Sequence, residues 1–116
     1  MANPDAQNVM ELEATGRLLG SEADARDILG EAFGSGAIII VVPVERLDPQ
    51  FLQLRSGLAG AFIQKLQQYE RRLFIVGDIT EAVAQSTALR DFVVETNRIG
   101  RHRFVPDRAA LSVALS

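Results

Sequence analysis

The sequence predicts an α/β fold with a mixed, mostly parallel sheet of four to five strands and helices packed on it. Strand patterns alternate with helix patterns along the 116 residues, which favours right-handed crossovers between parallel strands. Residues 37–42 and 73–77 are apolar throughout, as is typical of central strands covered on both faces. With 47% hydrophobic and 23% charged residues, the chain suits one globular domain. We therefore expect a single domain over residues 8–116, preceded by a flexible segment at residues 1–7.

A strand pair and then a helix are expected before the first central strand. Residues 9–12 and 17–19 are largely apolar and flank a Thr-Gly pair, which predicts a hairpin or two short strands. Ser21 is a good helix N-cap, and acidic residues follow it in the first turn. Apolar residues then recur at helical spacing until the Gly-Ser-Gly sequence at 34–36 ends the helix.

A long helical pattern follows the first central strand. Asp48 is a good N-cap with proline at the next position, and the pattern continues to about Glu70. Gly57 and Gly60 lie inside it, and each costs about 1 kcal/mol relative to alanine. Either Ser56 caps a second helical segment after a break, or another backbone approaches the glycines closely. We favour the break.

The C-terminal part contains two more helices and one more strand. Ser86 or Thr87 can cap a helix that ends within residues 97–100, and residues 102–105 form the last strand. A Pro-Asp pair then begins a short apolar helix that continues to Leu115. We expect the two central strands to be adjacent and parallel, with the long helix as the crossover between them.

Arg55 lies where a charged side chain is not expected. If residues 49–70 form one helix, a turn of about 100° per residue places Arg55 on its apolar face. A guanidinium keeps its charge, so burying it unpaired would be costly, and the expected partner is Asp78 at the end of a central strand. The other residues of this apolar face are Phe51, Leu58, Phe62, Leu66 and Tyr69.

Two interpretations of this pair remain open. A buried ion pair between Arg55 and Asp78 would pin the long helix to the sheet. The two charges could instead bind a small anionic ligand, because ligands in open α/β sheets lie beyond the carboxyl ends of the strands. Asp48 would lie at the same edge, so Asp48, Arg55 and Asp78 are the candidate ligand or ion-pair residues.

A second group of polar residues is expected at the opposite rim. Gln64, Lys65 and Tyr69 lie near the end of the long helix, and Glu95 and Asn97 lie near the end of the next one. If the two helices run parallel, these residues collect together and Lys65 can contact Glu95. They form either a solvated rim with weak ion pairs or a surface that contacts another protein.

Composition excludes several classes of function. The chain has no cysteine and one histidine, so we expect neither disulfides nor a zinc site, and no cofactor. The net charge of −3 argues against general binding of polyanions. The short basic sequence at 98–103, which includes His102, is expected to be a solvated loop or an ion-pair cluster rather than a nucleic-acid site. We expect a cytoplasmic protein without a membrane segment, because the longest apolar run is far too short to cross a bilayer.

Serine nucleophiles are not expected either. Ser56 and Ser86 occupy positions typical of helix caps, and no Gly-x-Ser-x-Gly sequence follows a strand. A serine-histidine-acid triad could use no histidine but His102.

Three sequence segments resemble a bacterial family known as domain of unknown function 4180, and the resemblance covers roughly residues 18–115. The segments read LRSGLAGAFIQKLQQY, LFIVGD and LRDFVVETNRIGRHRFV. Ala61 stands where the family pattern has glutamate. The resemblance implies family membership and no particular activity. The residues that match the family pattern are Leu54, Gly57, Leu58, Ala59, Gly60, Gln64, Lys65, Tyr69, Gly77, Asp78, Phe92, Glu95 and Asn97.

The order of strands and helices is similar to that of the sulfate transporter and anti-sigma factor antagonist (STAS) domain. That likeness implies a small non-catalytic module that regulates a protein partner through a phosphorylatable serine after a central strand. Here residues 47–50 read Leu-Asp-Pro-Gln, and the nearest serine is Ser56.

The resulting hypothesis is a STAS-like, non-enzymatic regulatory or protein-interaction module whose partner is another protein or a second copy of itself. The alternative is a small anionic ligand-binding or hydrolytic domain that uses Arg55, Asp48 and Asp78. A ligand site should gather several polar groups in one concave pocket. An interaction module should instead carry an exposed apolar or glutamine-rich patch.

Overall fold

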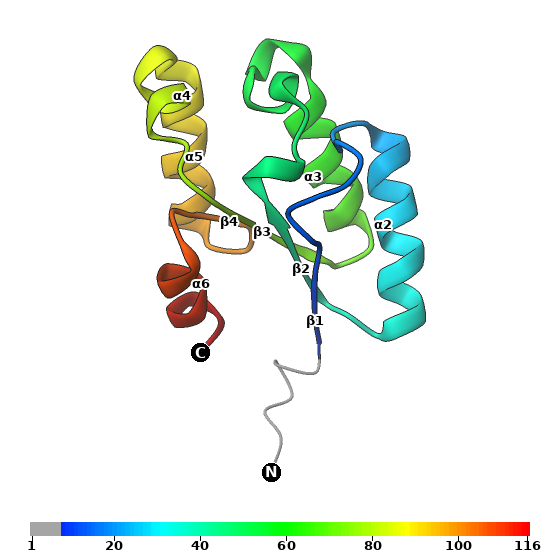
Figure 1. Ribbon diagram of the computed structural model, residues 1–116. Coiled ribbons are helices and arrows are strands. Elements are labelled where there is room, and N and C mark those ends of the chain that lie inside the picture. The colour runs from blue at the N-terminus through cyan, green and yellow to red at the C-terminus, as the bar shows by residue number, and fades with distance from the viewer. Residues whose placement is uncertain (1–7) are drawn as a thin grey trace.

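The computed structural model describes residues 8–116 (Figure 1), and the segment 1–7, which we expected to be flexible, lies outside the described residues. Its four strands lie side by side in chain order, and all three pairings are parallel. The α/β prediction is thus confirmed, although the sheet is parallel rather than mixed over the described residues. The strands are β1 (Val9–Glu11), β2 (Ile39–Pro43), β3 (Arg72–Val76) and β4 (Arg103–Val105).

The two central strands are adjacent and parallel, as predicted. Ile39 of β2 lies opposite Arg72 of β3, and Pro43 lies opposite Val76. Every residue of β2 is buried, because helices cover both faces of the sheet.

Three helices cover one face of the sheet, and the C-terminal helix packs on the other (Figure 1). The first face is formed by α2 (Glu22–Ser35), α3 (Leu58–Gln68) and α5 (Thr87–Ile99), and the second by α6 (Arg108–Leu115). Ile40 and Ile75 point into the larger core beneath the three helices, whereas Val41 and Phe74 point toward α6. Because successive side chains of a strand point to opposite faces of the sheet, the two buried strands contribute residues to both cores.

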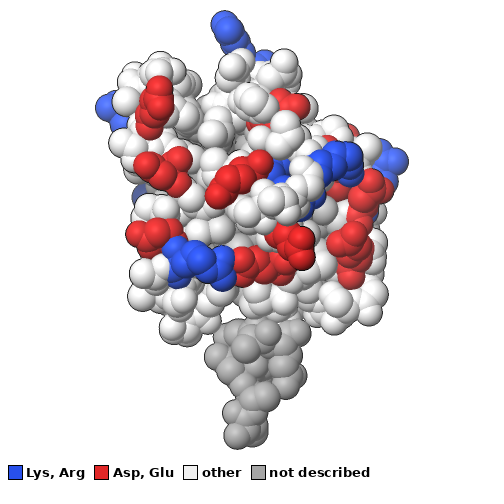
Figure 2. All heavy atoms as spheres, in the orientation of Figure 1, with Lys and Arg blue, Asp and Glu red and all other residues white. Residues whose placement is uncertain are grey.

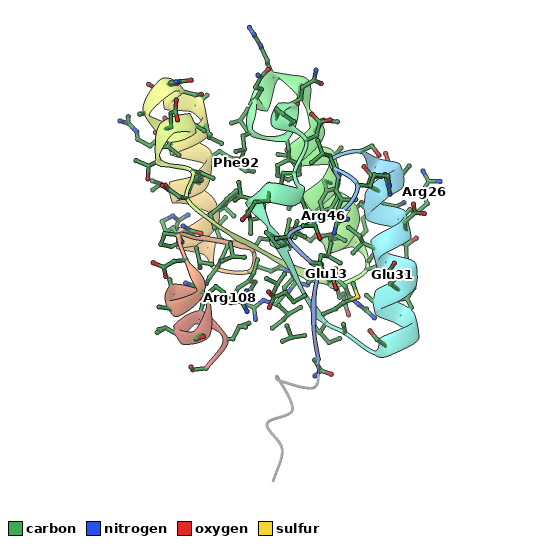
Figure 3. All side chains as sticks on the ribbon, in the orientation of Figure 1. Glu13, Arg26, Glu31, Arg46, Phe92 and Arg108 are labelled. Carbon is green, nitrogen blue, oxygen red and sulfur yellow. The ribbon has the colours of Figure 1, made fainter. Side chains whose placement is uncertain are left out.

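Of the two N-terminal alternatives, the hairpin is wrong, whereas β1 confirms a short strand within residues 9–12. Leu19 instead makes a single parallel bridge to Leu47, which follows β2. The Arg46 guanidinium donates hydrogen bonds of 2.8, 3.0 and 3.3 Å to three backbone carbonyls within residues 13–17 and holds that segment over the end of the sheet (Figure 3). A charged side chain distant in sequence thus replaces the strand pairing that the local pattern favoured.

The long helical pattern is broken, as we favoured. It consists of two short 3-10 helices, η2 (Pro49–Leu52) and η3 (Leu54–Ser56), followed by α3. Gly57 adopts a left-handed conformation with φ 78° between η3 and α3, and the Ser56 hydroxyl accepts a 3.2 Å hydrogen bond from the Leu58 N–H. Apart from neighbouring residues of the same segment, no atom lies within 4 Å of the position that a Cβ would take at Gly57 or Gly60, so the alternative of a close backbone approach is wrong.

The C-terminal elements agree with the cap signals. The Ser86 hydroxyl caps α5, Gly100 ends it in a left-handed conformation, and the Asp107 carboxylate caps α6. A short helix, α4 (Thr80–Gln85), precedes α5 and was not predicted; its N-cap position is Ile79, and the Asp78 carboxylate accepts from the Thr80 N–H instead.

Candidate functional site

Arg55 is exposed and forms no ion pair within residues 8–116, so its expected burial against Asp78 is wrong. The physical reason is the break at Gly57. Phe51 of η2 and Phe62 of α3 are both fully buried and meet edge to face at 5.6 Å, but they belong to segments with different axes. A single rotation of 100° per residue cannot be carried across such a break.

The two aspartates act as caps in the structure. Asp48 Oδ1 accepts a hydrogen bond of 2.9 Å from the Gln50 N–H, and Asp78 Oδ1 accepts one of 2.9 Å from the Thr80 N–H. The hydroxyl and then the N–H of Thr80 lower the pKa of Asp78. Arg55 lines a wide groove, Asp78 lines a separate pocket, and Asp48 lines neither. The three charged groups are therefore not gathered in one site.

Lys65 and Tyr69 face α2 rather than α5. Lys65 Nζ lies 3.8 Å from Glu22 Oε1 and 5.6 Å from the centre of the Tyr69 ring. The Tyr69 ring in turn meets Phe33 of α2 edge to face at 5.7 Å. The expected contact between Lys65 and Glu95 is wrong, because this side of α3 packs against α2.

On α5, the other two candidates have local partners. Glu95 forms an ion pair with Arg98, with distances of 2.5 and 3.0 Å. Asn97 Oδ1 accepts from the Phe104 N–H at 2.8 Å, and its Nδ2 donates to the Phe104 carbonyl at 3.1 Å. Asn97 thus satisfies both backbone groups of a residue in edge strand β4, which is a structural role.

Two pockets lie between the crossover that contains α3 and the crossover that contains α4 and α5, and we refer to the two together as the groove. Figure 2 shows a notch at the upper edge of the molecule, and its visible walls are mostly uncharged. The lower part has a volume of about 460 Å³ and the upper part about 700 Å³. Residues lining the lower part are Gly60, Ile63, Gln64, Gln67, Gln68 and Phe92. Those lining the upper part are Pro49, Leu52, Gln53, Leu54, Arg55, Ala82, Gln85, Ser86 and Ala88.

The chemistry of the groove is apolar and amide-rich. Phe92 projects from α5 into the space between the crossovers (Figure 3), and Ile63 of α3 is half-buried in the opposite wall. Five glutamines line the groove, and Arg55 is the one charged residue among its described lining residues. Of the five rim candidates, Gln64 lines the groove. Such walls can bury apolar groups and exchange hydrogen bonds with a polypeptide, and they contain no paired acid and base.

His102 lies buried next to one glutamine of the groove. Its Nδ1 accepts a 3.0 Å hydrogen bond from the Leu73 N–H, so the proton of the neutral ring is on Nε2, which donates to Gln67 Oε1 at 3.1 Å. Burial, and then the positive charges of Arg101 and Arg72, lower the pKa of His102 to about 4. His102 therefore orients Gln67 and does not present a cation to a phosphate.

A buried carboxylate that the sequence argument did not single out holds the start of α2. Burial alone would raise the pKa of Asp24, but hydrogen bonds from Arg17 and from the N–H groups of Gly20 and Ser21 lower it to about 2. The signal was available, because Ser21 and Asp24 have the spacing of a capping box.

Residues 8–116 contain neither a metal-binding cluster nor a membrane-spanning helix. No group of three or more histidine, aspartate or glutamate side chains within that range could hold a metal ion. None of the helices formed by those residues has both the length and the apolar character needed to cross a membrane.

A family model described as domain of unknown function (DUF4180) matches residues 4–115. The chain belongs to this family. No curated protein and no solved structure matches the chain, so the STAS-like fold stays a prediction. The description of DUF4180 assigns no activity, and the functional argument for this member therefore rests on the geometry of its groove.

Proposed function

We propose that this DUF4180 protein is a non-enzymatic regulatory module of the cytoplasm, with a STAS-like role, that binds another protein in the groove between α3 and α5. The observation that carries the proposal is the composition of the groove, with apolar side chains between glutamine-rich walls. Glutamine offers donors and acceptors to a peptide without the desolvation cost of burying more charge.

The sheet topology also supports an interaction module. In doubly wound α/β proteins, a ligand crevice forms where the strand order reverses. Here the strands follow one another in chain order, and the crossover helices all pack on one face, so the described strands create no such point. The anionic-ligand alternative has no comparable support, because Arg55, Asp48 and Asp78 line no common pocket.

A matched pair of substitutions on α5 tests the proposal. Ala88 is exposed and lines the groove, whereas Val94 is 61% exposed on the same helix and is not among the residues that line it. Ala88→Arg places a charge in the groove, and Val94→Arg places the same charge outside it. Proteins captured from the native cell by wild type should be lost with Ala88→Arg and retained with Val94→Arg.

Size-exclusion chromatography with light scattering measures the molar mass of each protein and so tests whether the partner is a second copy of this chain. If the partner is another copy of this chain, wild type and Val94→Arg should be dimers and Ala88→Arg a monomer. Equal capture and equal molar mass for both variants would contradict binding in the groove.

A further inference from the structure

A second, smaller pocket lies beyond the carboxyl ends of β3 and β4. Its volume is about 290 Å³, at the lower limit for small-molecule sites, so it suits a compact ligand. The lining is mostly apolar. The residues that form it are Gly77, Asp78, Ile79, Thr80, Val83, Val93, Phe104, Val105 and Pro106.

The pocket is left open by the way α4 packs. Ile79 and Val83 from the α4 segment and Val93 from α5 are each half-buried, so they retain apolar surface that a ligand could cover. The buried Phe104 contributes to the wall from β4.

The rim of the pocket is acidic. Asp78 lines it with an exposed carboxylate. Glu81 and Asp107 directly follow two lining residues and are exposed. Figure 2 shows acidic side chains over the lobe that α4 forms. Arg108, which follows Asp107 in the sequence, forms an ion pair with Glu11 of β1.

We propose that this pocket binds a small organic cation with an apolar body, such as an arylalkylamine. The apolar lining would bury the body of the ligand, and the carboxylate of Asp78 would attract its ammonium group. This site is separate from the groove, so the inference goes beyond the proposed protein-binding function and can fail or hold independently of it.

NMR titration of the full-length chain tests the inference with three probes that share a phenylethyl group and differ in charge. These are 2-phenylethylamine, the neutral 2-phenylethanol and the anionic 3-phenylpropionate. We expect saturable shifts at the methyl groups of Ile79, Val83 and Val93, with the amine binding most tightly and the carboxylate most weakly. The absence of saturable shifts from the amine up to about 10 mM, where millimolar affinities would be evident, would overturn the inference. So would equal affinity for the amine and the carboxylate.

Variants separate the two contributions. Asp78→Asn retains an oxygen that can cap Thr80 and should weaken amine binding by about threefold to fivefold, the upper part of the range for an exposed ion pair, without changing binding of the alcohol. Glu31→Gln, an exposed change on α2, should leave both unchanged. Val83→Phe fills the pocket and should abolish binding of both probes. Unchanged amine affinity in Asp78→Asn would overturn the role of the carboxylate, and that variant decides the matter even if Val83→Phe fails to fold.

Discussion

His102 should make the stability of the domain depend on pH between about 4 and 6.5. The ring is 7% exposed and neutral, and both of its nitrogens are hydrogen bonded. Its pKa falls from an ordinary value of 6.5 to about 4 in the folded protein. Between these values the unfolded chain binds a proton that the folded chain does not.

The sign and size follow from proton linkage. Because the unfolded state binds more protons between pH 4 and pH 6.5, the free energy of unfolding rises with pH across this window. The contribution is complete above about pH 6.5 and is lost as the pH falls toward 4. A difference of 6.5 − 4 ≈ 2.5 pKa units corresponds to about 3 kcal/mol.

Urea denaturation of wild type and His102→Asn at several pH values between 4 and 7 measures the contribution of His102 to the free energy of unfolding. Asparagine can still accept from the Leu73 N–H but does not titrate, so its stability curve should be flatter than that of wild type by up to about 3 kcal/mol. The chain has one histidine, so an imidazole NMR titration assigns the pKa without ambiguity. Parallel stability curves, or a folded-state pKa near 6.5, would refute the reasoning.

Three further substitutions test the structure by thermal and urea denaturation. Asp24→Asn should lower the free energy of unfolding by about 2 kcal/mol at pH 7. Wild type should lose the same stabilisation as the pH falls from 3.8 to about 2. Equal stability of the two proteins at pH 7 would contradict the stabilising role of the Asp24 carboxylate. Gly77→Ala should lower the free energy of unfolding by about 3 kcal/mol, because Gly77 has φ 147° and a Cβ there would lie 2.7 Å from Val44 Cγ2. Gly30→Ala should instead stabilise α2, because a Cβ at Gly30 would lie in open space. Arg55→Met should change stability by less than about 0.5 kcal/mol; a loss of several kcal/mol would restore a buried role for this arginine.

The sequence predicts the fold where local signals and burial agree. The N-cap at Ser21, the apolar runs of β2 and β3, and the caps at Ser86 and Asp107 each coincide with an element of the structure. Each signal lies within a few residues of the element that it starts or forms. Local patterns therefore predict most of the element order, although not α4, and through the right-handed crossover rule they predict the parallel sheet.

The candidate site was harder to predict, because the positions of its residues depend on contacts between segments that are distant in the sequence. The break at Gly57 changes the helix axis and moves Arg55 into solvent, so no periodicity calculation over residues 49–70 could place it correctly. The pairing of Lys65 with Glu22 depends on which neighbouring helix α3 packs against. Arg46 and His102 act on backbone groups about 30 residues away, and such contacts leave no local pattern.

Photo-crosslinking inside the native cell can show whether the groove between α3 and α5 binds a protein. The photoreactive residue p-benzoylphenylalanine would replace Gln64 in the groove wall or, as a control, the exposed Glu31 on α2. The account predicts a discrete crosslinked species from position 64 that is absent from position 31. No crosslink from position 64, or the same products from both positions, would contradict it.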